Sequence, residues 1–148
     1  MARNTPVTAG LARVLAGTAA LAVKTQNFHW NVEGPHFAAL HGLFEGQYGA
    51  LQEASDTLAE RIRALGDHAP GGLGAFAALS PVGDAPAAPP SAEAMVAALA
   101  KDHRRLSGEA GALLKTAEEA GDEVTVDMMI GRMTEHDKTA WMLDAHLR

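Results

Sequence analysis

The stretch NFHWNVEGPHFAALHGLFE, residues 27–45, holds a Gly34-Pro35 pair between two segments in which apolar residues recur at helical spacing. Proline has no amide hydrogen to continue a helix, so the pair is expected to end the first helix and to start an antiparallel second one. His29 lies six residues before Pro35, and His41 lies six residues after it. Equal offsets from a turn bring two side chains to the same level, so these imidazoles are expected to face one another.

Outward from this turn, the chain predicts four long helices and no strand. The starts are indicated by Thr5-Pro6, Ser91 and Asp122, since small polar residues favour the N-cap and proline favours the first turn. The stops are indicated by Gly66 and Gly121, because glycine is common just after a helix. The predicted helices run from Pro6 to the Gly34-Pro35 break, from Phe37 to Gly66, from Ser91 to Gly121 and from Asp122 to the terminus.

The segment between the second and third helices, GDHAPGGLGAFAALSPVGDAPAAPPS, is rich in glycine and proline. It is too long for a tight hairpin, and its LGAFAALS portion predicts one short helix. Two short connections and one long one are typical of an all-α, ferritin-like four-helix bundle with a crossover. An unrelated up-down bundle with an inserted loop is the alternative. The 148 residues are expected to form a single domain, residues 1–148.

Composition narrows the class of protein. Apolar residues make up 47% of the chain, which is typical of soluble globular proteins. No apolar run is expected to reach the roughly 18–20 residues of a membrane span, and the N-terminus lacks a signal-peptide pattern. The absence of cysteine excludes thiolate metal sites and fits the cytoplasm. With 18 acidic and 12 basic residues, the net charge of −6 favours cations over nucleic acid or membranes as partners.

Histidines and carboxylates on the second helix suggest a metal site. Glu45 follows His41 by four residues, and Asp56 and Glu60 are also four apart, so each pair projects from one face. Taken alone, such a pair is commonly part of a solvent-exposed polar face of a helix. His41 and Asp56, fifteen residues apart, are separated by about 22 Å of helical rise and cannot hold the same ion. Two copies of this helix, antiparallel about a two-fold axis near Ala50, would bring each chain's histidines to the other chain's carboxylates.

The set H-W-N, then H-x-x-x-E, then D-x-x-x-E-R resembles the Dps family, the DNA-binding proteins from starved cells or mini-ferritins. The resemblance spans nearly the whole chain, including the ending DKTAWML. It implies a hollow dodecamer with ferroxidase sites at its two-fold interfaces, where iron(II) is oxidised, typically by hydrogen peroxide, and stored as ferric mineral. The implied ligands are His29, His41 and Glu45 of one subunit with Asp56 and Glu60 of its partner, and Trp30 matches a tryptophan beside this site.

The ligand chemistry agrees with the resemblance, since imidazole and carboxylate suit iron, with zinc or manganese as substitutes. An intrasubunit di-iron centre is not expected, because the only E-x-x-H match, Glu33–His36, straddles the Gly34-Pro35 break. No haem is expected, and four methionines are assigned to core or interface: Met128, Met129, Met133 and Met142. Five other histidines are expected to be surface or local polar residues without comparable partners: His36, His68, His103, His136 and His146.

Acidic residues around the last helix turn have two interpretations. They are Glu118, Asp122, Glu123 and Asp127. As helix-start charges they favour the macrodipole, and Asp122 also makes a good N-cap. By resemblance they fall near three-fold pores, where acids would attract iron(II), and the pore interpretation is favoured most for Asp127.

Three function classes follow for a cytoplasmic protein: an iron oxidase and store protecting against oxidative stress, a nucleoid-associated DNA-compacting protein with a secondary metal site, or a shell without turnover. The second is disfavoured, because the chain offers only Arg3 before the first helix and ends AHLR, which neutralises few phosphates.

Overall fold

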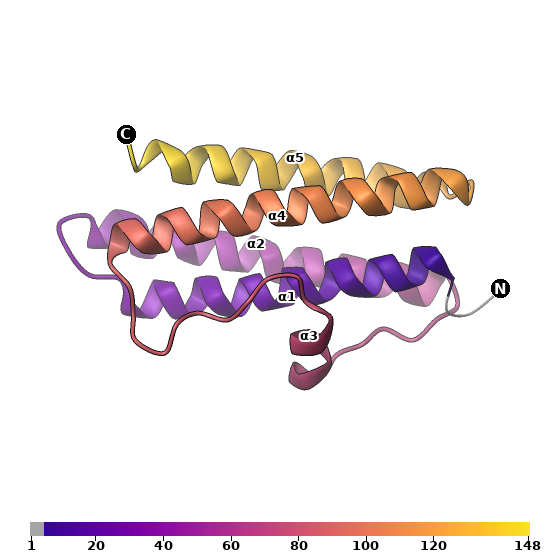
Figure 1. Ribbon diagram of the computed structural model, residues 1–148, viewed down its shortest axis with the longest axis horizontal. Coiled ribbons are helices and arrows are strands. Elements are labelled where there is room, and N and C mark those ends of the chain that lie inside the picture. The colour runs from indigo at the N-terminus through magenta and orange to yellow at the C-terminus, as the bar shows by residue number, and fades with distance from the viewer. Residues whose placement is uncertain (1–4) are drawn as a thin grey trace.

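The computed structural model describes residues 5–148 and is all-helical over that range (Figure 1). Four long helices and one short helix occur in the order α1 (Pro6–Asn31), α2 (Phe37–Ala64), α3 (Leu73–Leu79), α4 (Ala92–Glu119) and α5 (Glu123–Ala145). The four-helix bundle with a short helix in the crossover is therefore confirmed.

Each predicted N-cap is made as expected. The Thr5 side chain accepts a hydrogen bond from the Thr8 amide at 3.1 Å, and Pro6 begins α1. Ser91 accepts from the amide of Ala94 at 3.1 Å at the start of α4. These bonds satisfy amides that have no partner within the helix.

Two predicted glycine stops are also confirmed. Gly66 after α2 and Gly121 after α4 have φ of +93° and +71°, a left-handed conformation that only glycine adopts readily. At both ends the next amide bonds back to a carbonyl five residues earlier, as between Asp122 and Ala117 at 2.9 Å. These hydrogen bonds close the end of each helix and reverse the chain within a few residues, so α5 begins directly after α4.

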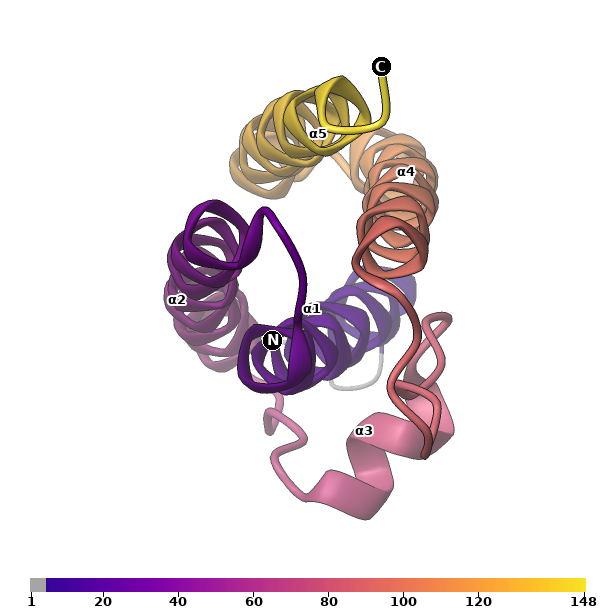
Figure 2. The same cartoon turned by 90° about the vertical axis from the view of Figure 1, so that its left-hand side faces the viewer.

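The bundle consists of two antiparallel hairpins. α1 packs on α2, α4 packs on α5, and the hairpins meet mainly through α1 and α4, as the end-on view shows (Figure 2). The crossover carries α3, which packs against α1 on the outside of the bundle. Glycines permit the close approach of α1 to α4, since a Cβ at Gly10 or Gly17 would lie 2.5 or 2.6 Å from a methyl of Leu113 or Leu106.

α1 is more apolar than expected from the sequence. It is long and apolar enough to cross a membrane, with an 18-residue window of mean hydropathy 1.5, so the expectation that no segment would reach this threshold is wrong. More than half of that window, 56%, is buried against the other helices. A central helix of a bundle meets such a criterion because it is apolar over a wide face.

Candidate metal centre

His29 and His41 face one another beside the turn that joins α1 to α2. Their rings stack with centroids 3.8 Å apart and planes 14° from parallel. The equal spacing on either side of Pro35 therefore brought the two side chains to one level, as expected. His29 is only 7% exposed, and His41 is half-buried, so the pair is held in place by the hairpin.

Two reciprocal hydrogen bonds fix the orientation of both rings. Nδ1 of His29 bonds to the carbonyl oxygen of His41, and Nδ1 of His41 bonds to the carbonyl oxygen of His29, each at 2.7 Å. A carbonyl only accepts, so each Nδ1 carries the proton and donates. In the neutral ring each Nε2 then keeps its lone pair. Nδ1–H bound to a backbone carbonyl is the arrangement typical of metal-binding histidines.

Aromatic side chains surround the histidine pair. Phe37 stacks on His41 with centroids 4.9 Å apart, and Tyr48 meets His29 edge-on at 5.4 Å. Trp30 is 64% exposed on the adjacent surface, so it is available for contact with another subunit. Glu45, one turn beyond His41, is exposed.

Asp56 and Glu60 form the second half of the predicted ligand set, further along α2. Both carboxylates are exposed. A hydrogen bond with Asp56, followed by the electrostatic repulsion between the two groups, raises the pKa of Glu60. Two neighbouring carboxylates that repel each other favour a cation between them, because the cation relieves the repulsion.

A single chain does not bring the two halves together. α2 runs unbroken from Phe37 to Ala64, so the rise of about 22 Å between His41 and Asp56 stands. Within residues 5–148 no group of three or more acids and histidines is placed to hold an ion.

The acidic residues at the α4–α5 turn divide into two kinds. Asp122 caps α5 by accepting from the Thr125 amide at 3.0 Å, and it pairs with Arg61 of α2 at 2.7 Å. Burial raises the pKa of Asp122, but the hydrogen bonds from Thr125 and Arg61 outweigh this and leave the pKa lowered. Asp127 is exposed and makes no such bonds among the described residues, so it is the freer of the two.

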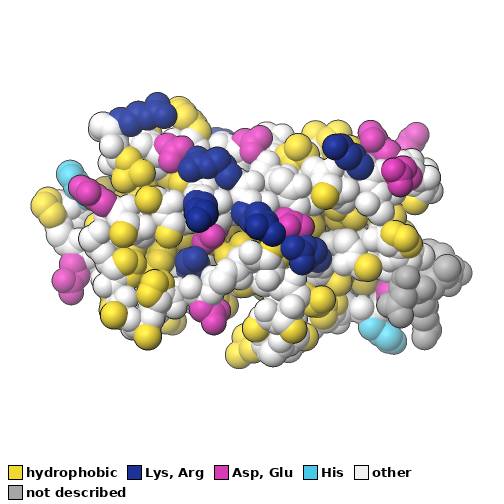
Figure 3. Space-filling view, viewed as in Figure 1, with side chains coloured by type: hydrophobic (Ala, Val, Ile, Leu, Met, Phe, Trp, Pro, Cys, Tyr) yellow, Lys and Arg dark blue, Asp and Glu magenta, His cyan; other side chains and the backbone are white. Residues whose placement is uncertain are grey.

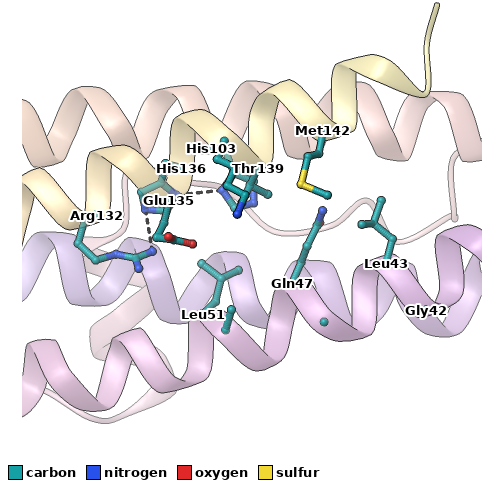
Figure 4. Close-up of a pocket in the computed structure, with 13 residues that line it drawn as sticks. Gly42, Leu43, Gln47, Leu51, His103, Arg132, Glu135, His136, Thr139 and Met142 are labelled. Carbon is teal, nitrogen blue, oxygen red and sulfur yellow. Dashed lines mark hydrogen bonds between the residues drawn. The ribbon is translucent and has the colours of Figure 1, made fainter.

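The interior contains a histidine pair that the sequence interpretation missed. His103 of α4 and His136 of α5 are 2% and 1% exposed, and their Nδ1 atoms lie 2.9 Å apart (Figure 4). The expectation that these two residues lack comparable partners is wrong. The signal was present: His136 lies seven residues after buried Met129 and seven before buried Leu143, on the apolar face of α5.

We expect this buried pair to make the fold acid-sensitive. Burial, followed by the charge of Arg132, lowers the pKa of His103 to about 4 and that of His136 to about 2. In the unfolded chain the same groups titrate near pH 6.5. Stability is therefore complete above about pH 6.5 and falls as the pH drops towards about 4, by about 3 kcal/mol from His103 alone.

Urea denaturation between pH 8 and 4, at fixed protein concentration, measures this effect. The His103→Gln/His136→Gln variant should show a flatter pH dependence below pH 6.5. The exposed His68→Gln variant is the matched control and should follow the wild type. An equal slope for all three proteins would contradict the assignment.

The helix order, the crossover and the histidine–carboxylate face define a ferritin-like protein, and residues 8–148 match the ferritin-like domain. DNA protection during starvation protein 2 of Bacillus anthracis is 36% identical over 144 residues, covering 97% of this chain and 98% of that protein. Dps from Staphylococcus aureus is 36% identical and superposes with a TM-score of 0.94, covering 100% and 99% of the two chains.

A third relative, the Dps protein of Vibrio cholerae, is described as a member of the ferritin-like diiron-carboxylate superfamily. It is 28% identical with a TM-score of 0.91, and covers 96% of this chain and 89% of that one. The chain belongs to the Dps family.

Proposed function

We propose that the protein is an iron-storing mini-ferritin that oxidises iron(II), preferentially with hydrogen peroxide, and protects the cell from oxidative damage. The observation that supports this most is the reciprocal bonding of His29 and His41, which leaves the lone pair of each Nε2 free to bind a metal. Membership of a family related to diiron-carboxylate proteins supports iron as the substrate metal. Zinc or manganese would fit the same nitrogen and oxygen ligands, and no haem is required.

The proposed site lies between two subunits. His29, His41 and Glu45 of one chain would bind iron together with Asp56 and Glu60 of the partner subunit. Two iron(II) ions each lose one electron, and one hydrogen peroxide takes up these two electrons with two protons to form two waters. Anionic carboxylate ligands stabilise iron(III) over iron(II), so they favour this direction. Two-electron reduction of peroxide also avoids release of a hydroxyl radical.

Assembly follows from this site. We propose a closed dodecamer of single-domain subunits in the cytoplasm, with the ferric mineral inside and acidic residues such as Asp127, and less so Asp122, near its pores. Native mass measurement of the protein before and after iron loading tests the assembly. Stopped-flow oxidation of iron(II) by equimolar peroxide, with oxygen alone as comparison, tests the activity. A monomer that oxidises iron as fast as the assembled protein would overturn both.

DNA compaction is the alternative function, and we expect binding to duplex DNA to be weak or absent at about 150 mM salt, where surface charges are substantially screened. The net charge is −6, and several basic side chains are already paired, as in Arg13–Glu109 and Arg104–Asp144. Lysine and arginine lie beside acidic side chains on the face drawn in Figure 3. Arg3 lies outside the described residues.

Gel mobility of plasmid DNA, with and without a chelator, measures this binding. The chelator is needed because a divalent metal could bridge two anionic surfaces. A chelator-resistant shift at that salt concentration would favour the DNA-compacting function instead.

A further inference from the structure

A pocket of about 310 Å³ lies between α2 and α5 (Figure 4). The α2 side has small side chains, because it includes Gly42, Gly46 and Ala50. The opposite side, on α5, carries Arg132, His136 and Thr139. At about 30 Å³ for each water, the space holds several waters, or a tetrahedral anion with some of them. None of the proposed iron ligands lines this pocket.

Arg132 supplies a half-buried positive charge that forms no ion pair among the described residues, although the nearby Glu135 acts on it electrostatically. Its only hydrogen bond among the described residues runs from Nη2 to Nε2 of His136, at 3.3 Å, and its Nε is buried without a partner. Burial lowers the pKa of this guanidinium, which stays charged. The other charged residues on the wall, Glu135 and Lys138, are exposed and of opposite sign, so the pocket carries one net positive charge with neutral histidines.

The arginine also determines which nitrogens of the two histidines carry protons. A guanidinium only donates, so Nε2 of His136 accepts and its Nδ1 must carry the proton. That Nδ1 then donates to Nδ1 of His103, which leaves the proton of His103 on Nε2. This Nε2–H is buried, without a hydrogen-bond partner. The wall therefore has two unsatisfied donors, at Arg132 and His103.

Gln47 of α2 adds a third group. Its side-chain oxygen is buried without a partner, and its nitrogen points across the gap towards α5 (Figure 4). This wall does not suit a transition-metal ion, which would need a free lone pair on Nε2 of His103. His103 would then carry its proton on Nδ1 and donate it to Nδ1 of His136. The proton of His136 would be left on Nε2, where it would face the N–H donor of Arg132. Hydrogen-bond donors around a guanidinium that has no ion pair favour binding of an anion.

We propose that this pocket is a binding site for a small tetrahedral oxyanion of the phosphate type, held by Arg132 with donors from His103 and Gln47. The anion neutralises the guanidinium and accepts hydrogen bonds from the unpartnered donors of Arg132 and His103. All of the residues that line the pocket belong to one chain and none is a proposed iron ligand, so binding does not require iron, although Ala50 on its α2 wall lies near the proposed two-fold axis.

Titration of inorganic phosphate into iron-free protein, by calorimetry at constant ionic strength in chloride, tests this proposal. We expect one saturable site per chain in the wild type and an affinity at least about tenfold lower in Arg132→Gln. Arg105→Gln, an exposed arginine on α4, is the matched control and should bind like the wild type. Gln47→Met, which removes the side-chain nitrogen directed towards α5, should fold normally and bind about threefold more weakly.

Sulfate, whose charge does not change between pH 6.5 and 8.5, provides a second measurement. Its affinity should be constant over that range, since the donors are a guanidinium and neutral imidazoles. The absence of a saturable site in the wild type, or equal binding by Arg132→Gln and Arg105→Gln, would overturn the proposal. An affinity that rises steeply towards pH 6.5 would overturn the neutral-histidine arrangement and with it the proposed site.

Discussion

Mixed shells of two inactive variants are expected to recover iron oxidation. The first variant, His29→Ala/His41→Ala, retains its carboxylates, and the second, Asp56→Ala/Glu60→Ala, retains its histidines. Each variant alone has two broken sites at every two-fold interface and should oxidise iron(II) slowly. In a mixed dimer one site has all its ligands intact, while the other lacks both histidines, Asp56 and Glu60. Random mixing makes half of the dimers mixed, so about a quarter of the wild-type sites should return.

Co-expression with two different tags, followed by stopped-flow oxidation with peroxide, measures the recovery. Native mass must first show that the shells contain both chains, and refolding of the two variants together is an independent check. Confirmed mixed shells that remain as slow as either parent would mean that the ligands do not meet across an interface. The histidines and carboxylates cannot meet within one chain instead, because the unbroken α2 helix keeps them apart.

Truncation of Phe28 to alanine is expected to give the largest loss of stability. Phe28 is 0% exposed and lies in a hydrophobic cluster to which all four long helices contribute, one residue before His29. Removal of a buried phenylalanine ring costs about 3–5 kcal/mol, because the contacts and the transfer free energy are both lost. The denaturation midpoint in urea, at fixed protein concentration, should fall accordingly.

Val23→Ala is the matched control for that truncation. Val23 is on the same helix but is 58% exposed, so its loss should change stability by no more than about 0.5 kcal/mol. Equal midpoints for the two variants would show that this part of α1 is not the core that the burial indicates.

The fold was predictable because its helix boundaries depend on local chemistry. Thr5, Ser91 and Asp122 cap their helices through their own side chains, and Gly66 and Gly121 adopt a backbone conformation that other residues resist. Such signals do not depend on distant parts of the chain. The facing of His29 and His41 was predictable for a similar reason, since a short turn relates their levels directly.

The interior histidine pair was harder to predict. His103 and His136 are 33 residues apart on long helices, so a small error in the position of the turn would change which residues meet. Polar residues also occupy apolar faces for several reasons, and the partner of a buried histidine becomes clear only in three dimensions. Trp141 illustrates the reverse case: it follows the apolar period of α5 but is 64% exposed. The site between subunits stays a prediction, because its second half belongs to another chain.

The reciprocal bonds between His29 and His41 also have a consequence for affinity. A freely rotating side chain loses conformational entropy when it captures an ion, at about 0.5–1.5 kcal/mol for each immobilised side chain. Both rings here are fixed by backbone carbonyls before any ion arrives. The two ligands together therefore avoid an entropic loss of about 1–3 kcal/mol, which corresponds to roughly 5- to 150-fold in dissociation constant. The half-site should thus bind scarce iron(II) without rearranging.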